Sequence, residues 1–86
     1  MITKDYIIMA PEGIHARPAA ALVKLTRQYK AVVRLRFKEK VVLLNSLLNL
    51  LSLGAKGGDT VTLQIEGEDE VPAAEALEQW FMELKN

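Results

Sequence analysis

The stretch TVTLQIE, residues 60–66, decides the fold class of this chain. Apolar and polar side chains alternate along it, with Val61, Leu63 and Ile65 on one side. A period of two residues is typical of a β-strand that buries one face and exposes the other. Residues 57–59, Gly-Gly-Asp, mark a turn before it. The stretch therefore predicts a strand in a sheet that is covered on one side only.

Outward from this strand, helix and strand patterns alternate along the chain. Residues 71–84 and residues 16–29 each carry an apolar stripe at helical spacing, and residues 32–37 alternate like residues 60–66. The other predicted elements are strands at residues 2–9 and 40–44 and a short helix at residues 47–53. The order β-α-β-β-α-β-α predicts a two-layer α+β sandwich with one open sheet face.

Composition bounds the kind of protein and the chemistry available to it. The chain has 86 residues, enough for a single domain over residues 1–86, and half of them are hydrophobic. With no cysteine and one histidine, disulfides, thiolate chemistry and a histidine-rich metal site are excluded, and we expect neither metal nor cofactor. No apolar run is long enough to span a membrane, and the N-terminal residues lack a signal-peptide pattern. We expect a cytoplasmic protein with no membrane attachment.

The zero net charge hides an asymmetry along the chain. Residues 1–43 hold nine basic and three acidic side chains, a balance of +6, whereas residues 44–86 hold two and eight, a balance of −6. Any basic surface must therefore come mainly from the first half of the chain.

The stretch GIHARP, residues 13–18, carries the candidate chemistry, because it lies where a loop meets the start of a helix. A helix N-terminus offers free N–H groups and partial positive charge to an anion. The imidazole of His15 is a nucleophile near neutral pH, and Arg17 would donate charge-assisted hydrogen bonds to phosphate oxygens. The simpler alternative is that His15 caps the helix and Arg17 is an ordinary surface charge.

A docking surface is predicted next to this site. Arg17, Ala20, Lys24 and Arg27 are three or four residues apart and share one helix face, which suits an acidic partner with an apolar centre. The short helix has more leucines than one buried stripe needs, which indicates an exposed apolar patch. An ordinary solvated face and a packed core helix are the alternatives. The predicted partner-binding residues are Ala16, Ala20, Lys24, Arg27, Leu47, Leu48 and Leu51.

These residues resemble a known family. The octapeptide at residues 13–20, Gly-Ile-His-Ala-Arg-Pro-Ala-Ala, is similar to the active-site motif of the histidine-containing phosphocarrier protein, HPr, of the bacterial phosphotransferase system. A second signature surrounds Ser46, and Glu-Gly-Glu-Asp at residues 66–69 precedes the last helix. The resemblance covers essentially the full chain. It implies an open-faced β-sandwich whose four-stranded antiparallel sheet carries three helices on one face.

The resemblance also implies a function. Members accept a phosphoryl group from phosphorylated enzyme I and pass it to sugar-specific enzyme IIA domains, so they are stoichiometric carriers and not stand-alone enzymes. His15 matches the histidine phosphorylated on Nδ1, and Arg17 matches the arginine that stabilises the phosphoryl group. We expect a monomer that binds no nucleic acid.

Ser46 and Glu12 each allow two interpretations. In some members the serine matching Ser46 is phosphorylated by a dedicated kinase, yet serine is also an ordinary N-cap, and Asn45 stands where kinase-regulated members usually carry lysine. Glu12 lies close to His15 in sequence, where its charge would repel a bound phosphoryl group, unless it points away.

Other functions compete with the phosphocarrier function. A regulatory-branch carrier, nitrogen-related or linked to a dihydroxyacetone kinase, fits the same residues, as does a non-catalytic protein-binding regulator. An RNA-binding sheet needs exposed aromatic side chains, but the outward positions of the predicted strands are Arg34, Arg36, Thr62 and Gln64. A hydrolase that uses His15 as a base lacks a convincing second catalytic group.

Overall fold

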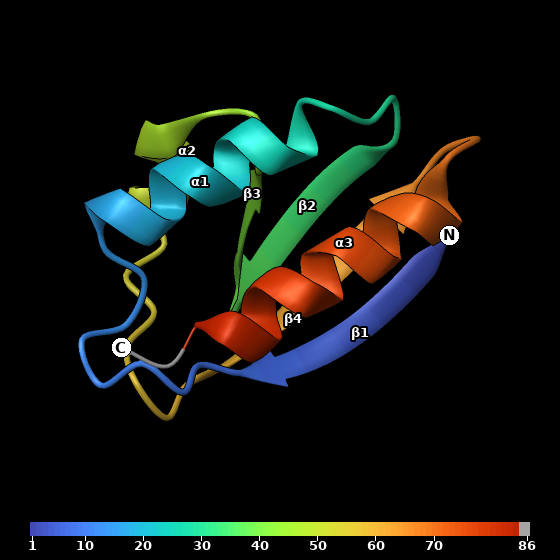
Figure 1. Cartoon of the computed structure of the whole chain (residues 1–86). Coiled ribbons are helices and arrows are strands. Elements are labelled where there is room, and N and C mark those ends of the chain that lie inside the picture. The colour runs from blue at the N-terminus through green and yellow to red at the C-terminus, as the bar shows by residue number, and fades with distance from the viewer. Residues whose placement is uncertain (85–86) are drawn as a thin grey trace.

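The computed structural model of the chain describes residues 1–84, which form four strands and three helices (Figure 1). The predicted order β-α-β-β-α-β-α is confirmed. In chain order the elements are β1 (Ile2–Ile7), α1 (Ala16–Thr26), β2 (Val32–Phe37), β3 (Lys40–Leu43), α2 (Leu47–Ser52), β4 (Thr60–Glu66) and α3 (Glu70–Glu83).

Helix α1 ends three residues before its predicted end, and the reason lies in Thr26. Its hydroxyl oxygen lies 2.8 Å from the Val23 carbonyl oxygen and 2.7 Å from that of Leu44, and its single hydrogen is shared between them, which ties the helix end to the chain beyond β3. After Thr26 the backbone tightens: Gln28 and Tyr29 donate to carbonyls three residues back. The apolar pattern continues to Tyr29, but the α-helix does not.

The sheet has the order β1-β4-β2-β3, and all neighbouring strands are antiparallel. Strand β4, which contains the alternating stretch at residues 60–66, lies between β1 and β2. Its side chains Val61, Leu63 and Ile65 are fully buried beneath the helices, as the alternation predicts. Figure 1 shows α1 and α3 side by side across one face of the sheet, with α2 beside α1.

The other face of the sheet is open, as predicted. The strand registers place Arg34, Arg36, Thr62 and Gln64 on it, and the Thr62 hydroxyl donates to the Asp5 carboxylate at 2.8 Å. Ile7 and Val41 are exposed apolar residues on the same strands. No aromatic side chain stands among the outward positions of these four strands, which removes the stacking surface of an RNA-binding sheet.

Helix α3 packs on β1 and β4 through aromatic rings. Phe81 stacks on Tyr6 with ring centroids 4.4 Å apart, and Trp80 meets the edge of Phe81 at 4.8 Å. Phe81 and Leu77 are buried, whereas Trp80, on the same helix, is only half-buried. Its outer side is therefore free to form part of a surface.

A carboxylate fixes the corner between α1 and β2. Asp69, the N-cap residue of α3, accepts the backbone N–H groups of Lys30 and Ala31, each at 2.8 Å. The hydrogen bond from Lys30 is the main reason that the pKa of Asp69 is lowered from its ordinary value of 3.8. One ionised side chain thus joins the start of α3 to the loop that carries the chain out of α1.

Candidate functional site

Gly13 shapes the loop that presents His15. Its backbone has a φ of +75°, which side-chain-bearing residues rarely adopt, and its N–H donates to the Ala10 carbonyl at 2.9 Å. A β-carbon at this position would lie 2.5 Å from the Ala55 carbonyl oxygen and 2.8 Å from Lys56 Cα. The loop before α1 therefore lies directly against the loop after α2, and only glycine fits the contact.

His15 is the N-cap residue of α1. Its backbone is extended, with φ −110° and ψ 177°, and its carbonyl accepts the N–H of Ala19 at 3.0 Å. The imidazole makes no capping hydrogen bond and is 40% exposed. The structure thus disfavours the simpler alternative that this side chain serves as a cap. The first turn carries no acidic residue, so its N–H groups face an environment that suits an anion.

His15 and Arg17 line the same open cleft, of about 400 Å³, between α1 and the end of α3. Pro18 and Ala21 complete the α1 wall, and the opposite wall consists of Trp80, Glu83 and Leu84. The sequence gives no sign that α3 reaches this site, because helical periodicity tells which side of α3 is apolar but not which element that side meets. Within residues 1–84 no carboxylate lies within 4.0 Å of Arg17. Its guanidinium can therefore serve an anion on His15.

Glu12 does not point away from His15. Its Oε2 lies 3.8 Å from Nε2 of the imidazole, and its own side chain is 79% exposed. The carboxylate thus lies beside Nε2 of the ring.

The predicted docking face divides between two grooves. Ala20, Lys24 and Arg27 line a shallow groove between α1 and α2, together with Val23 and Leu47, whereas Arg17 belongs to the cleft of His15. Ala16 is exposed in the first turn. On α2, Leu48 is 79% exposed and Leu51 is 37% exposed, while Leu50 carries the packing. The excess leucines are on the surface, as their number indicates.

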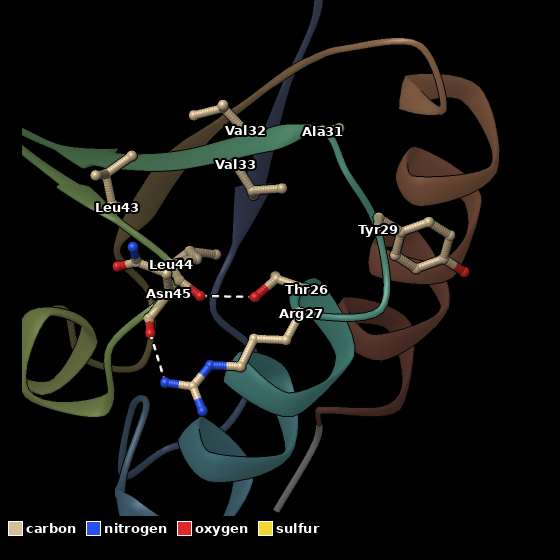
Figure 2. A pocket seen from close by; sticks show the side chains of 9 residues that line it. All are labelled: Thr26, Arg27, Tyr29, Ala31, Val32, Val33, Leu43, Leu44 and Asn45. Carbon is tan, nitrogen blue, oxygen red and sulfur yellow. Dashed lines mark hydrogen bonds between the residues drawn. The ribbon is translucent and has the colours of Figure 1, made fainter.

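Arg27 is held at the far end of α1 (Figure 2). Its Nη2 donates to the backbone carbonyl of Asn45 at 2.8 Å, so its charge lies close to the segment that leads into Ser46. Figure 2 shows this bond among the side chains that line a second, mostly apolar cleft. The volume of this cleft is about 250 Å³. That cleft shares no lining residue with the cleft of His15, which lies at the other end of the helix. It is lined by Thr26, Arg27, Tyr29, Ala31, Val32, Val33, Leu43, Leu44 and Asn45.

Ser46 is the N-cap residue of α2. Its hydroxyl oxygen accepts the N–H of Asn49 at 3.4 Å, a long hydrogen bond, and the residue is partly exposed. The amide of Asn49 in turn donates to the Leu43 carbonyl at 3.4 Å. The serine therefore has a structural role here.

The part of the chain that the structure describes shows neither a membrane-spanning helix nor a metal cluster. None of its helices is long and apolar enough to cross a bilayer. No group of three or more histidine, cysteine, aspartate or glutamate side chains in residues 1–84 is arranged to hold a metal ion.

Comparison with known proteins places the chain in a family. Residues 2–83 match the family model described as the PTS HPr component phosphorylation site. Phosphocarrier protein HPr of Lysinibacillus sphaericus is 39% identical over 84 residues, which cover 98% of this chain and 96% of the relative.

Solved structures agree. The crystal structure of HPr from Thermoanaerobacter tengcongensis superposes with a TM-score of 0.92 at 30% identity, over 99% of this chain and 96% of that one. Crh, a catabolite repression protein of Bacillus subtilis that forms a domain-swapped dimer, gives 0.77 at 34% identity, over 96% and 95% of the two chains. The chain belongs to the HPr family, the phosphocarrier proteins of the phosphotransferase system.

Proposed function

We propose that this chain accepts a phosphoryl group on Nδ1 of His15 from phosphorylated enzyme I and passes it to enzyme IIA domains of sugar uptake systems. The observation that carries the proposal is the state of His15 at the start of α1. It is an N-cap whose imidazole makes no capping bond, is partly exposed and shares a cleft with Arg17. On this proposal the protein is a stoichiometric intermediate and not a stand-alone enzyme.

The geometry suits a phosphoryl group that must be held and then released. The lone pair of Nδ1 would attack phosphorus while the bond to the donor breaks. Free N–H groups in the first turn and the guanidinium of Arg17 would stabilise the phosphoryl oxygens. The cleft between α1 and the end of α3 is open on its outer side, so the next acceptor can approach the phosphorus.

The surface around His15 would select its partners. Lys24 and Arg27 supply positive charge, Ala16 and Ala20 leave room for close approach, and Leu48 offers exposed apolar area. Leu47 and Leu51 extend this apolar area along α2. An acidic partner surface with an apolar centre complements it: the charges would raise the association rate and the apolar contacts would set specificity.

We further propose that residues 1–86 act as one cytoplasmic domain and as a monomer. The exposed edge strand β1 carries Lys4 and Asp5, and charged edges oppose strand pairing between copies. The dimeric state of Crh makes the point worth testing. Sedimentation equilibrium at micromolar concentration should return a mass of 9.6 kDa, and twice that value would contradict the proposal.

A second candidate is a regulator that acts through Ser46. The similarity to Crh and the position of Ser46 at the N-terminus of α2, beside the exposed Leu48, favour it. A phosphate there would meet the free N–H groups of the helix and lie near the anchored charge of Arg27. Incubation with a serine kinase specific for such proteins, with Ser46→Ala as the control, would test this role.

The decisive experiment uses phosphoenolpyruvate and enzyme I. Intact-mass measurement should show one phosphoryl gain on the wild-type protein, stable in base and lost in mild acid. The His15→Ala variant should show none. No gain with enzyme I proteins from several bacteria would overturn the transfer role and leave regulation as the better account.

A further inference from the structure

Glu12 has a defined place beside the reactive ring. Its carboxylate faces Nε2 of His15 at 3.8 Å, whereas the proposed phosphoryl acceptor is Nδ1, on the opposite edge of the imidazole. The Glu12 carboxylate and the phosphoryl group would therefore lie at opposite edges of one ring. This separation reduces the repulsion between them that the sequence predicts.

The backbone fixes this arrangement. The Gly13 N–H donates to the Ala10 carbonyl, and Gly13 itself is held against Ala55 and Lys56 in a conformation that only glycine adopts readily. Glu12 is the residue immediately before this anchored glycine, and His15 is two residues after it. The distance between the two side chains is thus limited by an anchored turn.

The charged groups near the imidazole come from three elements. Glu12 comes from its own loop, whereas Arg17 from the first turn of α1 and Glu83 from the end of α3 line the same cleft as His15. Within the described residues Glu12 is the one carboxylate that lies within 4.0 Å of the ring. Glu83 lines the same cleft without reaching that distance. Glu39, in the exposed turn between β2 and β3, lies outside the cleft and offers a matched comparison.

The chemistry of transfer depends on the proton at Nε2. When an acceptor attacks phosphorus, the Nδ1–P bond breaks and its electron pair stays on Nδ1. If Nε2 carries a proton, the leaving group is neutral imidazole; without it, the leaving group is an imidazolate anion, which departs far more slowly. A carboxylate at Nε2 favours the protonated, cationic form of the phosphorylated ring.

We propose that Glu12 is a positioning residue that holds the Nε2 proton of phosphorylated His15 and so keeps the phosphoryl group ready for transfer. This inference rests on the proposed phosphorylation of His15. The carboxylate never takes the proton. After transfer the ring keeps N–H at Nε2 and a free lone pair at Nδ1, which is the tautomer that accepts the next phosphoryl group.

The test follows the loss of the phosphoryl group with pH. Phosphoramidate serves as donor in place of enzyme I: Nδ1 attacks its phosphorus, the P–N bond breaks and ammonia leaves. The wild-type, Glu12→Gln and Glu39→Gln proteins are phosphorylated in this way. First-order hydrolysis is then measured by intact mass from acid to mildly basic pH.

We expect the midpoint of the hydrolysis profile to fall by about 0.3 pH unit in Glu12→Gln, since an exposed ion pair changes an equilibrium about twofold. At pH values above the midpoint the variant should lose its phosphoryl group about twofold more slowly than the wild type, as expected for so exposed a pair. Glu39→Gln should follow the wild-type profile.

Two results would overturn the inference. One is a Glu12→Gln profile that superposes on the wild-type profile; the other is an equal shift in both variants, which would indicate a general effect of negative charge. If phosphoramidate modifies the wild-type protein but not His15→Ala, these profiles test Glu12 whatever enzyme I does. If His15 accepts no phosphoryl group from either donor, the proposed function itself fails, and Glu12 with it.

Discussion

Arg17 and His15 are two residues apart in sequence and line the same cleft. The sequence is most informative about single residues such as these. The stretch GIHARP identified both candidates, because a nucleophile, a guanidinium and a helix start lie within six residues. Trp80 and Glu83, which form the other wall, were not predicted as part of the site. They belong to a helix far along the chain, and the packing of that helix on β1 and β4, which includes the stack of Phe81 on Tyr6, brings them there.

Arg17→Ala should slow phosphoryl transfer about 100-fold, the usual effect of removing a donor aimed at developing negative charge. The wild-type guanidinium is not engaged by a carboxylate within 4.0 Å in the described structure, so it is available to the phosphoryl oxygens. Rapid-quench transfer from phosphorylated enzyme I measures the rate. Arg34→Ala, on the open sheet face, is the control and should transfer at the wild-type rate.

Gly13→Ala should destabilise the protein by about 2–3 kcal/mol, because strain and a backbone clash act together. A β-carbon there meets the Ala55 carbonyl oxygen at 2.5 Å. Gly54 has the same φ of +75° but open space around it, so Gly54→Ala should cost only about 1 kcal/mol. Urea unfolding measures both, and equal losses would show that the contact with Ala55 contributes nothing.

At the scale of elements, starts were easier to predict than ends. Ser46 was a candidate for the start of α2 and is its N-cap, since local side-chain chemistry sets helix starts. The end of α1 depends on Thr26, whose hydroxyl bonds to Leu44, a residue distant in sequence. No local pattern contains that contact, which is why the apolar spacing overran the helix by three residues.

Ser46→Ala should lower the free energy of unfolding by about 0.5 kcal/mol, the low end of the range for an N-cap, because the capping bond is long. That bond, from the Asn49 N–H to the serine oxygen, measures 3.4 Å. Ser52→Ala removes a hydroxyl that donates to the Asn49 carbonyl at 2.7 Å, an interaction that does not support a helix. Chemical unfolding should give Ser52→Ala the same free energy of unfolding as the wild type, or a slightly higher one.

Asp69 links stability to acid pH. Because backbone N–H groups lower its pKa in the folded state below 3.8, the folded protein binds this proton less readily than the unfolded chain. Its contribution is therefore present above that ordinary value and is lost as pH falls through the lower, folded-state value. Asp69→Asn should be less stable than the wild type at neutral pH and should lose less on acidification. Thermal unfolding from pH 7 to pH 2 tests this, with the adjacent Glu68→Gln as control.

For the whole molecule, alternation predicted which face of each strand is buried but not which strands are neighbours. Residues 60–66 are the cleanest strand in the sequence and lie between β1 and β2. The pattern of a strand records its two faces, whereas its neighbours are set by how the helices cross over the sheet. The sequence likewise shows that the first half of the chain is basic, but not where its basic side chains gather. Lys24 and Arg27 line one groove because α1 packs beside α2.

Lys24→Glu should slow phosphorylation by enzyme I severalfold at low salt, because the basic groove of α1 and α2 would steer an acidic partner. The difference should shrink as salt rises and screens the exposed charges. Lys38→Glu makes the same change in net charge in the turn between β2 and β3. If Lys38→Glu slows the reaction as much as Lys24→Glu, the net charge of the protein, and not this groove, controls the rate of encounter with enzyme I.

The position of β1 in the sheet has a consequence for synthesis. Its one strand neighbour is β4, in which Ile65 pairs with Ile2 and Thr60 pairs with Ile7. These pairs cannot form until β4 has been synthesised. At the usual pace of a ribosome, the intervening chain takes roughly 3–10 s to make. During that interval the newborn strand has no complement in its own molecule. Strand β1 can therefore join the sheet only after residues 60–66 have been made, so the first strand to be synthesised is among the last to pair.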